Sequence, residues 1–523
     1  MSNEFFDAEK IASINVNRHK NVRTLLIEPQ NQFPPDAHRR PNGSLGPAYL
    51  GGALEQAGFE VDFLDATVGT ADQTLNDVFY RKTSPNEKGL VVVGMNDEEI
   101  LEAVQGYDIV AVTNIFTPQT TTSLRLGHLV KQANPNSLLV AGGINAWSLP
   151  DRFLDAGYDA IGLGEGEKLI VDLATSAARM ENWRNVPGLL HRVNGRGQNS
   201  GVPETIINLD MLPPPAHHLW PLDKYWQASA PHGGDFPIGM EVRYASIETS
   251  RGCPFWCSYC HISSLKDDSK VGPIGKLRLK SVDRVISEVV ELKSLGVEWL
   301  FFEDDSLLAK PERAITIFRK ISDLGLNLAD VNGVNLVHMY KRMPDGTLDV
   351  RLDLLEAMVA AGFKQLVLPF ESGSKRIIDK YAAGKWNPDT MDVVKLVRVA
   401  RELGLKVPGN FMIGFPDETP EELASTVALA KNLIQEGLTY ASFFIVVPYP
   451  GSKLFDEAIV QGHLDKDFDP DLFHWGNPVM NNTLIPPQEL IALRKEAWRE
   501  VNDPEFVKGK LERQVIPEPL EQI

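Results

Sequence analysis

A short apolar run of the kind that forms a buried strand recurs six times between residues 244 and 450. The runs begin near Tyr244, Glu298, Val331, Gln365, Lys406 and Ala441, so 33 to 54 residues separate each start from the next. Each interval holds a helical pattern, as in the apolar stripe that follows the candidate N-cap Ser281. Repeated strand–helix units of this length close into a parallel barrel or partial barrel, with the active site at the carboxyl ends of the strands. We therefore predict a partial (β/α)6 barrel over residues 241–455.

All three cysteines of the 523-residue chain follow the first predicted barrel strand directly. They are Cys253, Cys257 and Cys260, and three thiolates with this spacing can converge on one face of a loop. Three soft sulfur ligands bind three irons of a cubane cluster and leave the fourth iron open for a reactant. Buried or solvated thiols without metal are the alternative, although three randomly placed cysteines would rarely fall within eight positions. Their odd number argues against a disulfide framework and favours a reducing compartment.

The N-terminal third alternates between strand and helix patterns. Apolar runs at 22–28, 60–65, 108–113, 137–142 and 160–163 are separated by helical patterns, which predicts a doubly wound parallel sheet. Residues 71–100 have mixed character, and we expect an insertion of helices and loops there. Ligands of such sheets bind beyond the carboxyl ends of the strands. Glycines at those ends allow a backbone to approach a large ligand closely, or they only make tight turns. The residues at these strand ends are Thr113, Asn114, Gly142, Gly143, Gly164, Glu165 and Gly166.

The cysteine motif, with Tyr259 just before its third cysteine, resembles the signature of the radical SAM superfamily. The resemblance implies that Cys253, Cys257 and Cys260 bind a [4Fe-4S] cluster, and that S-adenosylmethionine chelates its open iron. Later strand ends resemble the family's other cofactor-facing elements, including a Glu-Ser-Gly segment and a Pro-Tyr-Pro-Gly turn. The S-adenosylmethionine contacts implied by the resemblance are Tyr259, Glu303, Asp304, Asp305, Glu371, Ser372, Asn410 and Pro448. His338, after the third strand, either faces the cavity or is a structural histidine.

Residues 20–180, placed directly before this motif, are similar to the cobalamin-binding domain of cobalamin-dependent radical SAM enzymes. The resemblance implies that cobalamin contacts the seven strand-end residues from Thr113 to Gly166 named above. Classical cobalamin domains carry Asp-x-His-x-x-Gly, whose histidine is the lower ligand of cobalt. This chain reads Asp36-Ala-His38-Arg-Arg-Pro41, with proline in place of the glycine, so we do not predict histidine ligation.

The cysteine count narrows the reactions that this resemblance implies. With no spare cysteine, the chain lacks the thiols of methylthiotransferases, of enzymes with auxiliary clusters and of methylases with a methyl-carrying cysteine. The remaining expectation is methylation of an unactivated carbon of a small molecule by a 5'-deoxyadenosyl radical and methylcobalamin, with an external reductant of the flavodoxin or ferredoxin type. Alternatives are methylation of phosphorus, cyclisation or rearrangement, a relative that binds no cobalamin, and a cluster-containing binding or sensor protein without turnover.

Composition and patterning complete the expected organisation. A net charge of -18 without long acidic blocks disfavours bulk nucleic-acid binding, although a small anionic substrate remains possible. No run approaches the roughly 18 apolar residues of a membrane span, and the N-terminus lacks signal-peptide features, so we predict a cytoplasmic enzyme. We expect a Rossmann-like cobalamin domain over 1–200, a Pro-rich linker with His217 and His218 over 201–240, the barrel over 241–455, and a mostly helical cap over 456–523.

Overall fold

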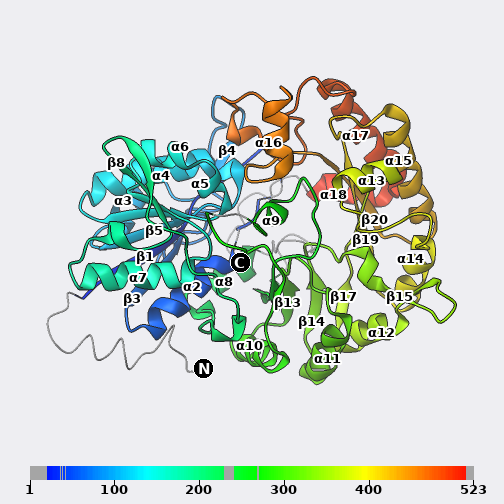
Figure 1. The fold of residues 1–523 in the computed structure, drawn as a ribbon, viewed down its shortest axis with the longest axis horizontal. Helices are drawn as coiled ribbons and strands as arrows, with labels where there is room; N and C mark the ends of the chain where they lie inside the picture. Colours follow the sequence, from blue (N-terminus) through cyan, green and yellow to red (C-terminus); the bar gives the residue numbers. More distant parts are fainter. Residues whose placement is uncertain are drawn as a thin grey trace.

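In the computed structural model, the chain forms two α/β units that lie side by side, with the C-terminal segments across the top (Figure 1). The structure describes residues 21–35, 37, 39–41, 43–228, 241–267 and 270–513. Asp36 and His38, which belong to the altered cobalamin motif, lie outside the described residues. Within the described part of the chain, no helix is both long enough and apolar enough to cross a bilayer.

The N-terminal unit is built on a seven-stranded sheet with the order β3-β1-β5-β6-β7-β8-β9. The strands β1 (Arg23–Glu28), β3 (Glu60–Asp65), β5 (Ile109–Thr113), β6 (Leu138–Gly142) and β7 (Ala160–Gly162) run parallel, which confirms the predicted doubly wound sheet. β3 pairs with one side of β1, and β5 pairs with the other side, so the strand order reverses between β1 and β5. Ligands of such sheets bind at this topological switch point, which here lies beside Thr113 at the end of β5. The antiparallel strands β8 (Leu189–Val193) and β9 (Arg196–Asn199) extend the sheet and were not predicted. All four residues of β9 are exposed and none is apolar, so β9 has no apolar run that marks a strand.

Helices cover both faces of this sheet. The helices α2 (Leu45–Gln56) and α7 (Gly166–Ala178) pack on one face, where Leu26 and Leu54 are buried. The helices α3 (Asp97–Ala103), α4 (Thr120–Ala133), α5 (Ile144–Ser148) and α6 (Pro150–Asp155) pack on the other, against Leu25 and Ile27. Alternating residues of β1 therefore feed two separate cores, as expected for a strand buried on both faces. Within 71–100, the prediction missed the short strand β4 (Val91–Val93), which pairs with β2 (Asn31–Phe33).

The C-terminal unit is the predicted partial barrel of six parallel strand positions. The strands β10 (Tyr244–Ile247), β13 (Trp299–Phe302), β14 (Asn327–Asp330) and β17 (Phe363–Gln365) form one half. The strands β18 (Leu368–Glu371), β19 (Pro408–Ile413) and β20 (Tyr440–Ile445) form the other. A bridge from Gln365 to Lys406 joins the halves, so β17 and β18 are two parts of one strand position. The helices that follow are α10 (Val282–Ser294), α11 (Pro311–Ile321), α12 (Leu352–Ala361), α13 (Lys375–Tyr381), α14 (Val393–Glu402) and α15 (Pro420–Gln435).

One barrel strand was predicted at the wrong place. The third strand ends at Asp330, whereas the prediction began it near Val331. The apolar residues that follow belong to a loop and the short 3-10 helix η6 (Leu336–Met339), where Val334, Leu336 and Met339 are buried. Apolar character marks burial, and a short buried run does not distinguish a strand from a packed turn.

The C-terminal cap is mostly helical and contacts both units. It contains α16 (Lys453–Val460), the 3-10 helix η7 (Pro470–Leu472), α17 (Pro487–Val501) and α18 (Pro504–Arg513). The side chain of Asn502 pairs with the backbone of Ala441 on the open edge of β20, at 2.7 and 2.9 Å. On the other side, buried Asp471 accepts hydrogen bonds from Gln32 Nε2 at 2.7 Å and Lys88 Nζ at 2.5 Å. The cap therefore ties the last barrel strand to the N-terminal unit.

The segment between the units runs along α2 through the 3-10 helices η3 (Leu209–Met211) and η4 (His217–Leu219) and the helix α8 (Leu222–Ala228). His217 is buried edge-on against Trp220, at 4.8 Å between ring centroids. His218 Nε2 lies 2.9 Å from Glu55 Oε1. The two imidazoles therefore contact different neighbours.

Candidate active site

The cysteines lie in a loop whose two ends are paired as a short antiparallel ribbon. The loop leaves β11 (Ser250–Arg251) and returns at β12 (Arg278–Leu279), and α9 (His261–Ser264) follows Cys260 directly. In Figure 1, α9 lies in the middle of the molecule between the two units. Gly252 has a φ of 81°, and a Cβ there would lie 2.5 Å from Lys276 O, so only glycine fits. We call the described residues 252–267 and 270–277 the cysteine loop.

The donor set of this loop fits an iron–sulfur cluster. Cys257 is buried and the other two thiols are half-buried. Burial, reinforced by the Asp305 carboxylate, raises the pKa of the Cys260 thiol to about 12, so a thiolate there needs bound cations such as iron. Among the described residues, no three His, Cys, Asp or Glu side chains are arranged for a single metal ion. A cubane does not require such convergence, because each thiolate binds its own iron.

Tyr259 connects the cysteine loop to the fourth barrel strand. Its hydroxyl donates to Glu371 Oε1 at 2.7 Å, and Lys385 Nζ lies 2.9 Å from the same oxygen. Glu371 ends β18 with a φ of 64°, a conformation that non-glycine residues adopt rarely and mostly at functional sites. The structure thus brings the predicted residues Tyr259 and Glu371 together and adds Lys385. No motif marks this lysine in the sequence.

The three carboxylates after β13 point to different partners. Glu303 accepts a hydrogen bond from Ser246 Oγ at 2.5 Å, and Asp305 accepts one from Gly252 N at 2.9 Å. Burial raises the pKa of Glu303 to about 7 and that of Asp305 to about 6. Asp304 differs, because Thr249 and Ser250 donate four hydrogen bonds of 2.5–3.0 Å to its two oxygens. Asp304 is buried, and these hydrogen bonds hold the start of the cysteine loop in place.

The other predicted barrel residues are Ser372, Asn410, Pro448 and His338, and they differ in burial and in contacts. Ser372 is buried and contacts Thr426 Oγ1 at 3.1 Å, so its hydroxyl stabilises the turn before α13. Asn410 is half-buried on β19, and Pro448 is buried just beyond β20. His338 lies against the cysteine loop, with its ring 5.6 Å from that of Phe255 and Nε2 3.5 Å from Ser306 Oγ. Burial lowers the pKa of His338 to about 4, which keeps the imidazole neutral.

The predicted cobalamin residues at the ends of β5 and β6 lie around a network of neutral side chains. Asn114 Nδ2 donates to Ser123 Oγ at 2.8 Å, and Asn145 Nδ2 donates to Asn114 Oδ1. The Asn114 side chain is therefore buried and hydrogen-bonded to its neighbours at this sheet edge. Gly142 differs, because a Cβ there would meet nothing within 4 Å. At Gly143, φ is 97° and a Cβ would lie 2.6 Å from Asn114 O.

Two buried acceptors at this edge have no partner among the described residues, namely Gln119 Oε1 and Asn145 Oδ1. Unsatisfied buried acceptors are costly unless a ligand or water donates to them. Cobalamin carries amide side chains around its ring, which can donate such hydrogen bonds. The open space at Gly142 and these acceptors therefore fit the cofactor.

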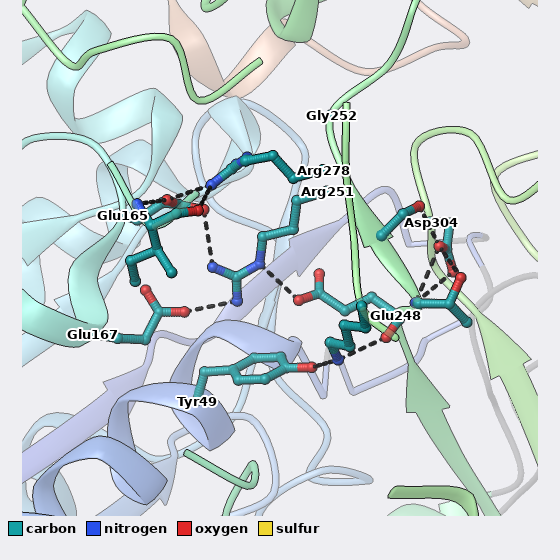
Figure 2. A network of polar contacts seen from close by, with 12 residues as sticks. Tyr49, Glu165, Glu167, Glu248, Arg251, Gly252, Arg278 and Asp304 are labelled. Carbon is teal, nitrogen blue, oxygen red and sulfur yellow. Dashed lines mark hydrogen bonds and ion pairs between the residues drawn. The ribbon is translucent and has the colours of Figure 1, made fainter. Parts of the chain in front are cut away.

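The predicted residues after β7 pack against neighbouring segments of the chain. Glu165 turns toward the barrel and contacts Arg251 and Arg278 at 3.0 and 2.7 Å (Figure 2). A Cβ on Gly166 would lie 2.9 Å from Leu50, and one on Gly164 would lie 2.8 Å from Pro203. Tight packing therefore accounts for both glycines. The sequence shows a carboxylate at a strand end, but it does not show that two arginines from another unit bind it.

Comparison with known proteins gives the same two parts. Residues 247–430 match the Radical SAM superfamily, and residues 42–174 match the B12 binding domain. An uncharacterized methyltransferase of Pyrococcus horikoshii is 31% identical over 361 residues, which are 68% of this chain and 70% of the relative. The cytidylyl-2-hydroxyethylphosphonate methyltransferase of Streptomyces wedmorensis is 26% identical, over 81% of this chain and 79% of the relative.

The fold as a whole also has a solved counterpart. The structure of the radical S-adenosylmethionine methyltransferase TsrM from Kitasatospora setae, with cobalamin and a [4Fe-4S] cluster bound, superimposes with a TM-score of 0.61. It is 18% identical in sequence, and the match covers 92% of this chain and 83% of TsrM. The chain belongs to the cobalamin-dependent radical SAM methyltransferases, enzymes that use a [4Fe-4S] cluster, S-adenosylmethionine and cobalamin.

Proposed function

We propose that this enzyme methylates an unactivated carbon of a small molecule bound between the barrel and the N-terminal sheet. The observation that carries the proposal is the position of the cysteine loop, which contacts both units. Tyr259 reaches Glu371 of the barrel, while Leu265, Val271 and Ile274 pack into the core of the N-terminal unit. The whole chain has only three cysteines, so no thiol remains for a methyl-carrying or auxiliary-cluster role.

We assign roles to the site residues on the same basis. Cys253, Cys257 and Cys260 would hold the cluster, and Glu303, Asp305 and Glu371 would receive the ammonium and hydroxyl groups of S-adenosylmethionine. Tyr259 and Lys385 would orient Glu371, and Asn410 and Pro448 would border the nucleoside. Thr113, Gly142 and Gly143 would face cobalamin. When bound, the cofactors supply the radical and the methyl group, and the residues position the reactants and exclude water.

Methylation of phosphorus is the second candidate, because the relative from Streptomyces wedmorensis is named for a phosphonate substrate. The identity of 26% supports the family and leaves the substrate of this chain open. We further propose an external one-electron donor of the flavodoxin or ferredoxin type, because the cluster must be reduced before each reaction. We also propose a reducing, cytoplasmic setting, because the three cysteines bind iron only when they do not form disulfides.

An isotope experiment tests the reaction. The protein is reconstituted anaerobically with iron, sulfide and hydroxocobalamin and given S-adenosylmethionine with a deuterated methyl group, a reductant and a metabolite extract. We expect one product to gain a trideuterated methyl group, and its fragmentation assigns the group to carbon or phosphorus. A product that loses two hydrogens and gains no label would instead indicate cyclisation. Failure of stoichiometric cobalamin to bind would refute the methyl-transfer proposal.

A further inference from the structure

Two arginines face each other where the cysteine loop begins and ends. Arg251 on β11 and Arg278 on β12 are directly opposed in the antiparallel ribbon. Their side chains are only 15% and 7% exposed, so water screens the two positive charges poorly. Like charges in directly opposed positions destabilise such a pair of strands. The ribbon that closes the loop therefore needs an anion from outside itself.

Glu165 of the N-terminal unit supplies that anion. Its Oε1 lies 3.0 Å from Arg251 Nη1, and its Oε2 lies 2.7 Å from Arg278 Nη1, so one carboxylate bridges both guanidinium groups (Figure 2). Glu165 is 9% exposed, and the two arginines hold its pKa below the usual value although burial opposes this. Glu167 and Glu248 each accept a further hydrogen bond from Arg251 at 2.7 Å.

The rest of the cysteine loop is attached to the same unit by apolar contacts. Leu265, Val271 and Ile274 belong to the hydrophobic cluster that contains Val112 of β5 and Ala141 of β6. Residues 164–166 follow β7 and lie at the same sheet edge as the proposed cobalamin residues Thr113 and Gly142. One sheet edge therefore contacts both the proposed cobalamin site and the loop that carries the cysteines.

We propose that Glu165 is a positioning residue, which closes the cysteine loop by bridging Arg251 and Arg278 and so fixes the cluster site relative to the cobalamin edge. Breaking a buried ion pair by removing one partner is strongly destabilising, because it leaves charge uncompensated. Loss of the Glu165 charge would leave Arg251 with Glu167 and Glu248 but would leave Arg278 with no ion pair among the described residues, so the loop should open at the Arg278 side of its base while both units stay folded. The proposal rests on the family's two cofactors and on no assumption about the substrate, so it survives if the cobalamin-loaded protein forms no labelled product.

Hydrogen exchange of the reconstituted protein tests the proposal. In Glu165→Gln, which keeps the side-chain shape, we expect amides of 248–261 and of 163–169 to exchange about tenfold faster than in the wild type. Adding Arg278→Met removes the repulsion, so the double variant should recover most of the protection. The matched control is Glu99→Gln, which breaks the bidentate pair with Arg81 inside the N-terminal unit and should leave both segments unchanged.

A second readout separates positioning from general stability. The protein is loaded with hydroxocobalamin, both metal centres are reduced to paramagnetic states, and pulsed EPR measures the distance between cobalt and the cluster. We expect a narrow distribution in the wild type and in Glu99→Gln and a broader one in Glu165→Gln. Unchanged exchange and an unchanged distance in Glu165→Gln would overturn the proposal, as would a double variant less protected than Glu165→Gln.

Discussion

The barrel edge and the ends of β5 and β6 in the N-terminal sheet have opposite chemistry. The barrel edge presents ionisable groups, namely the three cysteines, Glu303, Asp305, Glu371 and Lys385. The described edge of the N-terminal sheet at β5 and β6 presents amides, hydroxyls and glycines. Charged groups suit a cofactor with an ammonium, a carboxylate and a sulfonium on a metal cluster. Neutral donors and acceptors with open backbone suit a large ring that carries amides, and this contrast supports our proposal of one cofactor at each edge.

The largest expected effect is the loss of one cluster ligand on the barrel edge. In Cys257→Ala we expect iron content to fall and formation of 5'-deoxyadenosine to drop at least about a hundredfold, because two thiolates do not hold a cubane with one open iron. Binding of hydroxocobalamin should stay within about threefold of wild type, because its contacts lie on the other edge. If 5'-deoxyadenosine still formed, the cluster assignment would be refuted. If cobalamin binding were lost, the proposal that its contacts lie on the other edge would be contradicted.

The second prediction concerns the ion pair between Lys385 and Glu371, whose side chains are 15% and 6% exposed. Lys385→Met should lower the free energy of unfolding by about 3–5 kcal/mol, because a buried carboxylate then remains unpaired beside the cluster thiols. The control is Lys131→Met on the other unit, whose partner Asp159 is 30% exposed, and its cost should stay near 1 kcal/mol. Urea unfolding measures the free energy of unfolding of both variants. Equal decreases would contradict the argument that the buried Lys385–Glu371 pair is the costlier one to break.

Local sequence predicted most elements of both units, and it failed where contacts between distant segments decide. The parallel strands of the N-terminal sheet are buried on both faces, so their apolar runs are visible without any knowledge of their neighbours. The cysteine motif is equally local. In contrast, Asp304 and Glu165 were recognised as strand-end carboxylates, but their direction depends on Thr249 and Arg251, which lie more than 50 residues away. Lys385 carries no signal because only the fold brings it to Glu371.

Two adjacent glycines sharpen the comparison on the N-terminal edge. At Gly143, φ is 97° and a Cβ would lie 2.6 Å from Asn114 O, so Gly143→Ala should destabilise the protein by about 1–3 kcal/mol. At Gly142, a Cβ meets nothing within 4 Å, so Gly142→Ala should change stability by less than about 0.5 kcal/mol. Its added methyl group enters the space proposed for cobalamin, and hydroxocobalamin affinity should fall about tenfold. Unchanged affinity in Gly142→Ala would place the ring elsewhere.

The smallest expected effect is a pH dependence that arises at Glu303 on the barrel edge. Burial, together with the Glu248 and Asp304 charges, raises the pKa of Glu303 from 4.5 to about 7, although the Ser246 hydrogen bond opposes the shift. Between these two values the folded state holds a proton that the unfolded state has released, so this group makes the protein less stable as pH rises from 4.5 to 7. Ionised Glu303 is the form that accepts hydrogen bonds from an ammonium group, so S-adenosylmethionine affinity should increase several-fold from about pH 6 to about pH 8. The ammonium of S-adenosylmethionine titrates as well, and the isosteric variant Glu303→Gln corrects for it. If titration calorimetry gives parallel affinity curves for the two proteins, Glu303 does not receive that group.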